Sequence, residues 1–180
     1  MQNKVLKFKK LLTFITSFIF SIFEETQTIM GVSARKFNSF TFFKLPAAWW
    51  TGVRVKSINK QTCVVTVTHS WRNQNPFKSM FWAVQGMAAE LSTGAMVIAQ
   101  IRERKEKISM LVANNNANFS KKATGRITFT CEDGHLIKDA IDKTIATGEG
   151  QTFWMKSVGV NEDGVVVSTF NFEWTVRVKG

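Results

Sequence analysis

The chain is poor in the residues that mark several classes of protein. Its 180 residues include two cysteines, two histidines and two prolines. Two cysteines are too few for the disulfide framework of a small secreted domain. The histidines, His69 and His135, are far apart and lie in no metal-binding spacing, so we expect neither a metal site nor a cofactor. An apolar fraction of 44% is typical of globular proteins and excludes wholesale disorder.

Acidic residues are also scarce. Thirteen Asp and Glu residues stand against 24 Lys and Arg residues, which gives a formal charge of +11. A basic chain attracts anions such as nucleic acid, anionic lipid or the phosphates of coenzyme A. The basic residues form separate groups within 4–10, 102–107 and 121–126, and no nucleic-acid-binding motif accompanies them. We therefore expect no nucleic acid partner, and a solvated basic surface is the simplest alternative.

The first part of the chain lacks a hydrophobic run long enough to cross a membrane. The run Leu11–Phe23 is shorter than the roughly 20 residues that span a bilayer. It follows several lysines, as in a signal peptide, but Glu24 and Glu25 stand where a small-residue cleavage site would be. We expect an amphipathic helix that packs on the domain or across a subunit interface. The alternative is peripheral contact of residues 1–25 with a membrane surface.

Both cysteines, Cys63 and Cys131, lie within runs that alternate apolar and polar residues, as strands do. Buried thiols in a reducing compartment fit this pattern better than a disulfide does. The sequence therefore predicts a cytoplasmic protein, with peripheral membrane contact as the alternative.

Period-two patterns predict six strands, at 53–58, 63–70, 108–119, 125–132, 149–160 and 165–178. Residues 31–48 show little periodicity and are expected to form a connector. A short amphipathic helix is expected at 135–147, and Asn161–Gly164 has the composition of a hairpin turn.

A longer helix is expected between Lys78 and Arg102, where Glu90 is the only charged residue. A helix that is apolar nearly all round must be covered, and one antiparallel sheet curled around it would do so. A ferredoxin-like sandwich would need a second long helix late in the chain, which the sequence lacks. We therefore predict an α+β fold in which a curved antiparallel sheet wraps around a long central helix.

Glu90 is the residue that the pattern singles out. It shares one stripe of the expected helix with Gly86 and Gly94, each of which costs about 1 kcal/mol of helix stability relative to alanine. Such glycines allow another backbone or a ligand to approach closely. A lone buried carboxylate is costly unless it is paired or used in chemistry. In the alternative interpretation Glu90 has only a structural role, because it forms a hydrogen bond to the sheet or lies at a subunit boundary.

The segment before this helix contains Asn75-Pro76, a turn-forming pair, and Ser79 is expected to cap the helix. One interpretation is simply a tight turn. The other is functional, because the free N–H groups at the positive end of the helix dipole can polarise an acyl carbonyl.

Two segments carry a resemblance to a known family. From Asn75 to Glu90, an Asn precedes an acidic residue by fifteen positions, and residues 118–126 read NFSKKATGR. Both segments resemble the hot-dog thioesterases of the phenylacetate-pathway type. The segment Trp71-Arg72-Asn73-Gln74-Asn75 makes the likeness greatest to an uncharacterised hot-dog branch that carries an extra helix before its last strands. The resemblance covers about residues 46–179.

The resemblance implies hydrolysis of an acyl thioester such as an acyl-CoA. Glu90 would act as general base toward water or as nucleophile, and Asn75 would orient the water or the carboxylate. The backbone N–H groups at Phe81 and Trp82 would stabilise the oxyanion. The phosphates of coenzyme A would be bound by Lys121, Lys122 and Arg126.

The sequence departs from the family at Phe81-Trp82-Ala83, where the family has His-Gly-Gly. A backbone N–H survives any side chain except proline, but two aromatic side chains would narrow or fill the acyl pocket. The alternative function is therefore a non-catalytic acyl- or lipid-binding hot-dog protein. A hot-dog dehydratase would need a His–acid pair, which neither His69 nor His135 supplies.

The expected organisation is a helical extension with a connector over residues 1–45, followed by a hot-dog domain over residues 46–180. Hot-dog relatives build their sites across a subunit interface. The resemblance therefore implies a homodimer or a dimer of dimers.

Overall fold

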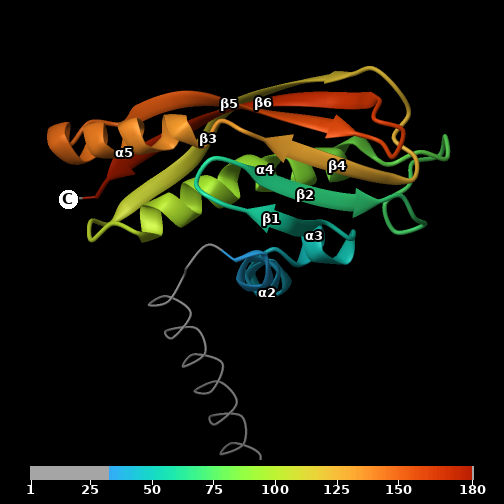
Figure 1. Cartoon of the computed structure of the whole chain (residues 1–180), viewed down its shortest axis with the longest axis horizontal. Coiled ribbons are helices and arrows are strands. Elements are labelled where there is room, and N and C mark those ends of the chain that lie inside the picture. The colour runs from blue at the N-terminus through green and yellow to red at the C-terminus, as the bar shows by residue number, and fades with distance from the viewer. Residues whose placement is uncertain (1–32, 180) are drawn as a thin grey trace, which may run out of the picture. The chain divides into compact units, whose positions relative to one another are not determined.

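The computed structural model describes residues 33–179 (Figure 1). The expectations for the first 32 residues, the amphipathic helix and its membrane contact among them, lie outside the described residues. The elements are, in chain order, α2 (Ala34–Lys44), α3 (Pro46–Trp50), β1 (Arg54–Ile58), β2 (Cys63–Thr68), α4 (Trp82–Arg102), β3 (Ile108–Phe119), β4 (Arg126–Cys131), α5 (His135–Thr147), β5 (Gln151–Val160) and β6 (Val166–Val178).

The six strands form one antiparallel sheet in the order β1-β2-β4-β5-β6-β3. After α4 the chain crosses to the far edge of the sheet, where β3 pairs with β6. Figure 1 shows the sheet curving over α4, with α2 and α3 on the helix side. The predicted architecture, a curved antiparallel sheet packed on a long central helix, is confirmed.

The central strands alternate because every second residue faces the helix. The buried positions of β2 and β4 are Cys63, Val65, Val67, Ile127, Phe129 and Cys131. Cys63 and Cys131 lie opposite each other in the register of the two strands, and both are free and fully buried. Burial raises the pKa of each thiol to about 12. The prediction of buried, unpaired thiols is therefore confirmed.

The central helix packs on the sheet through small residues and paired polar groups. Three polar contacts join α4 to β5 and β6: Ser168 Oγ donates to Gln85 Oε1 (2.8 Å), the hydroxyls of Ser92 and Ser157 lie 2.7 Å apart, and Trp174 Nε1 donates to Thr93 Oγ1 (3.0 Å). Buried polar groups are costly when left unpaired. These contacts therefore fix how far α4 lies along the sheet and which of its sides faces the strands.

The connector predicted for residues 31–48 is wrong for the described residues, because α2 and α3 occupy most of that segment. Tertiary contacts hold α2 in place. Phe37 is fully buried, and the Asn38 side chain both donates to the carbonyl of Val55 and accepts from its N–H, each at 2.9 Å. Pro46 starts α3, where its missing N–H costs no hydrogen bond. Weak periodicity could not predict a helix that is stabilised mainly by docking on β1.

Other boundaries follow the predictions closely. All six strands and α5 lie within two residues of their predicted limits. The predicted hairpin turn is present, because Gly164 has φ +77° and Asn161 Oδ1 accepts from the N–H of Val165 at 2.8 Å.

Within residues 33–179 no helix is both long and apolar enough to cross a bilayer. The division between an extension and a domain at residue 45 stays a prediction.

Candidate functional site

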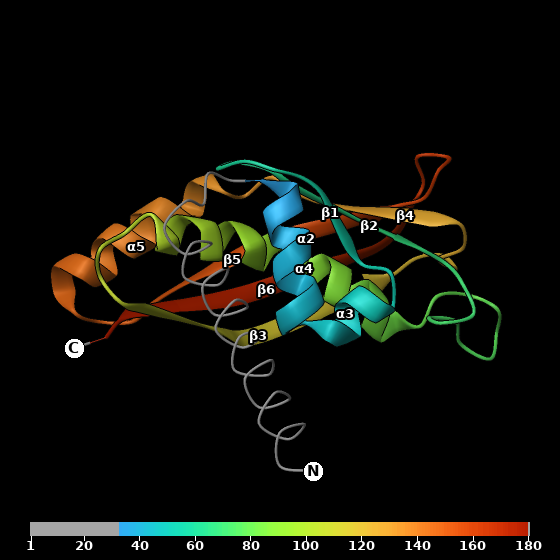
Figure 2. The same ribbon diagram turned by 90° about the horizontal axis from the view of Figure 1, so that it is seen from below.

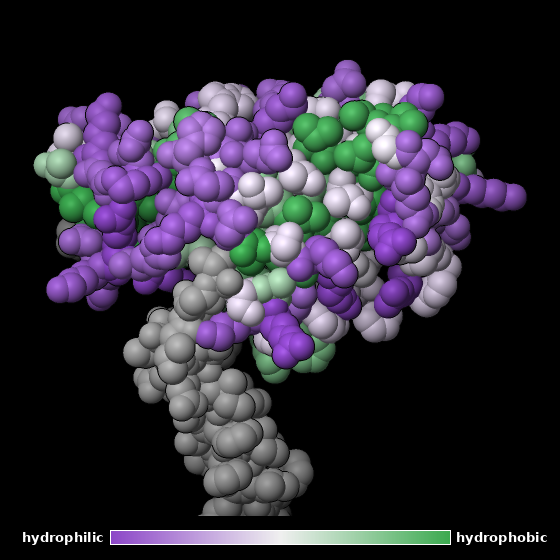
Figure 3. Space-filling view, in the orientation of Figure 1, coloured by the Kyte–Doolittle hydropathy of each residue, from purple (hydrophilic) through white to green (hydrophobic). Residues whose placement is uncertain are grey.

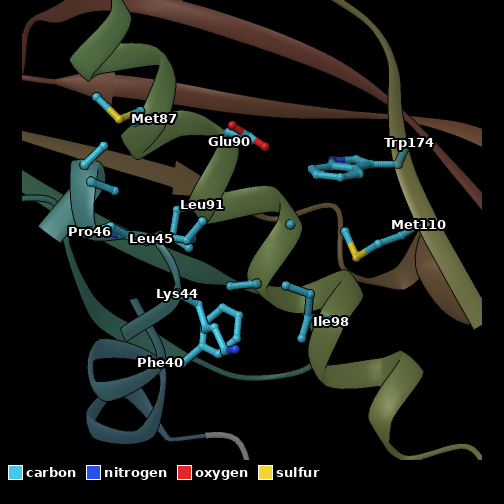
Figure 4. Close-up of a pocket in the computed structure, with 14 residues that line it drawn as sticks. Phe40, Lys44, Leu45, Pro46, Met87, Glu90, Leu91, Ile98, Met110 and Trp174 are labelled. Atoms are coloured by element: carbon cyan, nitrogen blue, oxygen red, sulfur yellow. The ribbon is translucent and has the colours of Figure 1, made fainter. Parts of the chain in front are cut away.

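An apolar cavity of about 490 Å³ lies beside the side of α4 that the sheet does not cover. Its walls come from α2, α3, α4, β3 and β6, and its lining includes Phe40, Leu45, Met87, Leu91, Ile98, Met110 and Trp174. Figure 4 shows Glu90 and Trp174 approaching the cavity from α4 and β6, while Phe40 and Lys44 approach it from the region of α2. A cavity of this volume with mostly apolar walls suits a small organic ligand or an acyl group.

Glu90 is the acidic residue of this cavity, and the expectation that it is buried is wrong for the single chain. Its side chain is exposed on the open side of α4, while the residues facing the sheet are buried. The reason is that the sheet covers only one side of the helix. Glu90 follows directly on the buried pair Ala88 and Ala89, but its own side chain is exposed and lines the cavity together with Trp174 of β6 (Figure 4).

The glycines on either side of Glu90 serve the packing of α4 on β6. A Cβ added at Gly94 would lie 3.0 Å from two ring atoms of Trp174, and one added at Gly86 would lie 3.6 Å from the ring of Phe170. The close approach expected of these glycines is therefore made by aromatic side chains of the sheet. At Gly94 this brings the Trp174 ring to the cavity wall.

The Glu90 carboxylate has no hydrogen-bond or ion-pair partner among residues 33–179. Apart from Lys44, the residues that line the cavity with it are apolar, and this partial burial raises the pKa of its carboxyl group above the ordinary value although the side chain is exposed. A carboxylate in apolar surroundings with no fixed partner can accept a proton or attack an electrophile. Within the same residues no three His, Cys, Asp or Glu side chains form a group that could hold a metal ion.

Asn75 shapes the loop before α4. Its Oδ1 accepts from the N–H of Phe77 at 2.9 Å, and its Nδ2 donates to Ser79 Oγ at 3.0 Å. Ser79 is thus held by Asn75 and does not cap the helix, whose N-cap is Phe81. Within one chain, both Oδ1 and Nδ2 of Asn75 form hydrogen bonds inside this turn. The interpretation of Asn75 as part of a tight turn therefore explains both contacts.

The two predicted oxyanion donors differ from each other. The N–H of Phe81 donates to the carbonyl of Asn73 at 2.7 Å, which ties the residue to the preceding loop. The N–H of Trp82, the first residue of α4, has no acceptor among the described residues. It lies at the positive end of a 21-residue helix and is therefore suited to an oxyanion.

The predicted coenzyme A residues lie near the same end of α4. The loop that contains Lys121 and Lys122 contacts the loop before α4, because Met80 N–H donates to the carbonyl of Ala123 at 2.8 Å. Lys122 Nζ lies 3.5 Å from the carbonyl oxygen of Phe77. Arg126 differs, because its guanidinium forms an ion pair with Glu162 at 2.9 Å. Of these three residues, Lys121 and Lys122 have no ion pair within residues 33–179, and Lys122 is the one whose ammonium group contacts the loop before α4.

Sequence reasoning missed the cavity residues contributed from outside α4. Phe40, Lys44 and Leu45 lie in a segment taken for a connector, so no signal pointed to them. Trp174 could have been found, because Phe170, Phe172 and Trp174 alternate along β6 and all face the helix side of the sheet.

Solved structures resemble this fold. A probable thioesterase of unknown function from Pseudomonas aeruginosa is 18% identical with a TM-score of 0.71, covering 83% of this chain and 99% of that one. A protein of unknown function from Chlorobaculum tepidum is 18% identical with a TM-score of 0.71, covering 81% and 94%. A thioesterase from Haemophilus influenzae is 14% identical with a TM-score of 0.63, covering 83% and 93%. At such identities the likeness shows the shared hot-dog fold alone.

No curated protein matches the chain. The family model of a domain of unknown function, DUF4442, matches residues 33–176. The predicted likeness to an uncharacterised hot-dog family is therefore confirmed, and the chain belongs to the DUF4442 family.

Proposed function

We propose that this protein hydrolyses an acyl thioester and that Glu90 is the catalytic carboxylate. The observation that carries the proposal is the position of Glu90 on the wall of an apolar cavity of about 490 Å³, with no partner among the described residues. The pKa of Glu90 is raised by burial, which makes its carboxylate a better proton acceptor than an ordinary Glu. The thioesterase names of two structural neighbours support the same reaction class.

In this mechanism the acyl chain lies in the cavity and the thioester carbonyl lies beside Glu90. The carboxylate takes a proton from water as the water oxygen attacks the carbonyl carbon, and the carbonyl electrons move to oxygen. An N–H at the start of a helix stabilises this oxyanion. Collapse of the intermediate breaks the C–S bond, and the thiolate leaves with the proton that Glu90 had taken up. In the variant mechanism the Glu90 carboxylate attacks the carbonyl carbon, the C–S bond breaks and the thiolate leaves, and water then hydrolyses the resulting mixed anhydride to the free acid and the Glu90 carboxylate.

One chain cannot supply both groups to the same carbonyl. Glu90 and Trp82 are eight residues apart on α4, which corresponds to about 12 Å along a helix. A homodimer would resolve this by pairing Glu90 of one protomer with the α4 N-terminus of the other. The edge strand β3 supports such an assembly, because Ile108–Phe119 contains no charged residue or proline to block pairing with a second strand.

The substrate we propose is an acyl-CoA. Lys121 and Lys122 lie beside the N-terminus of α4 and are exposed, so their ammonium groups can bind phosphate through charge and hydrogen bonds. Arg126 would have to leave Glu162 to join them. The buried free thiols of Cys63 and Cys131 support a reducing, cytoplasmic setting for this reaction.

The test is thiol release from a panel of acyl-CoA esters by the wild type and by Glu90→Gln. We expect Glu90→Gln to lower kcat/KM by about a hundredfold or more, because general base catalysis contributes that much. Glu103→Gln is the matched control, since Glu103 ends the same helix but pairs with Lys60 at 2.8 Å, outside the cavity. The wild-type rate should fall at acid pH with a midpoint above the ordinary Glu value. Equal activity of Glu90→Gln and wild type would contradict the site.

A second candidate is a protein that binds acyl groups or lipids without hydrolysing them. It is favoured by Phe81 and Trp82, whose exposed rings occupy the place of the family's His-Gly. The same panel separates the two, because a binding protein would release no thiol from any ester yet retain acyl-CoA measurably by calorimetry.

A further inference from the structure

The cavity extends further on one side of Glu90 than on the other. Six residues of α4 line it at steps of three and four along one stripe of the helix: Met87, Glu90, Leu91, Gly94, Ala95 and Ile98. At about 1.5 Å per residue, the stripe continues for about 12 Å from Glu90 to Ile98 but for less than about 5 Å from Glu90 back to Met87. Figure 4 shows Glu90 toward the upper end of the cavity, and Phe40 and Ile98 at its lower end. A chain whose carbonyl lies at Glu90 therefore has room mainly in the direction of Ile98.

The walls along this stretch are apolar. On one side, a Cβ added at Gly94 would lie 3.0 Å from the ring of Trp174 and 3.9 Å from Cε of Met110. On the other side lie residues of α2 and α3, and Figure 2 shows these two helices passing in front of α4 on its open side. Apart from Glu90 and Lys44, every residue that lines the cavity is apolar. A chain in this stretch would therefore be buried against apolar groups along its length.

Phe40 marks the far end of the cavity. Arg102 lies one turn after Ile98 on the same side of α4, and its guanidinium carbon lies 5.3 Å from the centroid of the Phe40 ring. Beyond this point residues 102–107 are all charged. Figure 3 shows that hydrophilic side chains predominate at the left, where the C-terminal end of α4 lies in Figure 1. A chain that passed Phe40 and Ile98 would therefore leave the apolar groups that are the source of its affinity.

The distance from Glu90 to Ile98 limits the length of a bound chain. With C–C bonds of about 1.5 Å, an extended saturated chain advances about 1.25 Å per carbon, so about ten carbons span roughly 12 Å. The volume is less restrictive. Ten groups at about 30 Å³ each, the volume of a water molecule in the liquid, would occupy about 300 of the 490 Å³. The cavity therefore restricts the length of a chain more than its width.

We propose that the cavity selects a straight acyl chain of up to about ten carbons, whose methyl end lies against Phe40 and Ile98. Each carbon buried along the stripe raises the affinity about fourfold, whereas carbons beyond Ile98 add nothing. The position of the carbonyl at Glu90 rests on the proposed function. The length limit itself does not require hydrolysis, because it acts on binding.

The test is calorimetric binding of straight-chain S-alkyl coenzyme A thioethers, in a series that increases to about sixteen carbons. These thioethers have no carbonyl and cannot be hydrolysed. Ile98→Phe shortens the cavity and Ile98→Ala lengthens it, at a side chain that is only partly buried. Ile101→Phe and Ile101→Ala are the matched controls, because Ile101 is also partly buried on α4 but does not line the cavity. Thiol release from the matching acyl-CoA series is measured in parallel.

In the wild type we expect the affinity to rise about fourfold per carbon up to about ten carbons and then to stop rising. This limit should move to about eight carbons in Ile98→Phe and to about twelve in Ile98→Ala, and it should stay in place in both Ile101 variants. Absence of binding at any length, a rise that continues through the whole series, or the same limit in both Ile98 variants would overturn the proposal.

The length limit and the hydrolysis can fail separately. A limit that moves with Ile98 while no acyl-CoA releases thiol would support the length proposal and contradict the proposed function. Thiol release at equal rates along the series, with no limit in binding, would do the reverse. A change of mass in light scattering in Ile98→Phe, with an unchanged length profile, would overturn the length proposal and assign this part of the cavity to subunit contact.

Discussion

The two sides of α4 use polar residues in opposite ways. On the side facing the sheet, Gln85, Ser92 and Thr93 each meet a partner from β5 or β6 at 2.7 to 3.0 Å. On the open side, Glu90 has no partner among residues 33–179, and partial burial against the cavity wall raises the pKa of its carboxyl group. Paired buried groups fix a structure, whereas an unpaired ionisable group beside a cavity is suited to chemistry. We therefore assign stability to the sheet side and function to the open side.

The largest expected effect on stability is at Trp174 of β6, whose indole is hydrogen-bonded to Thr93 of α4 and also forms part of the cavity wall. Trp174→Ala removes a ring that is 4% exposed, together with its hydrogen bond to Thr93. We expect a loss of about 3–5 kcal/mol in the free energy of unfolding, measured by urea titration. Trp154→Ala is the control, because Trp154 is 42% exposed on β5 and should cost much less. Similar costs for the two variants would refute the assignment of stability to the sheet side.

A smaller effect distinguishes the two glycines of α4. In Gly94→Ala the new methyl group would lie 3.0 Å from Trp174, whose ring is held by Thr93, so we expect a loss of about 1–3 kcal/mol. In Gly86→Ala the methyl group has 3.6 Å to Phe170, so the gain in helix propensity should stabilise by up to about 1 kcal/mol. Thermal or urea unfolding of the pair gives the comparison. If both substitutions raised the free energy of unfolding, the packing at Gly94 would be looser than the 3.0 Å distances indicate.

The smallest expected effect concerns the stability cost of Glu90 itself. Its pKa is higher in the folded chain than in the unfolded one, so the folded state binds the proton more tightly. Stability should therefore fall as pH rises from the ordinary Glu pKa through the raised one. Glu90→Gln removes this loss, so the variant should melt slightly above wild type at pH 7 and together with it below pH of about 4. A variant that melts below wild type at pH 7 would indicate a stabilising partner for Glu90.

Sequence patterns predicted the sheet well, because each strand carries its own signal. Alternation in 63–70 and 125–132 located β2 and β4, and it placed Cys63 and Cys131 inside. The same reasoning failed for α2, whose helix depends on Phe37 and Asn38 docking against the segment at β1. Local periodicity carries no information about a helix that is held by contacts distant in sequence.

The candidate site likewise contains one feature that the sequence predicted and others that it could not predict. Glu90 could be predicted because a lone acid in an apolar helix is conspicuous at the level of composition. Its exposure could not, because the helix is apolar on nearly every side and the pattern does not say which side the sheet covers. The distinction between Phe81 and Trp82 as donors also needed the structure, since it depends on the carbonyl of Asn73.

By itself the sequence determined the element order, the central helix and the single acid upon it, because these follow from local hydrophobic period and composition. Only the tertiary structure decided which glycines meet aromatic rings, where the cavity lies, and that α2 and α3 help to line it. These features arise where segments distant in the chain meet, as Lys44, Glu90 and Trp174 do around one cavity. Packing geometry of that kind is not encoded in any one stretch of residues, so it becomes visible only in the folded chain.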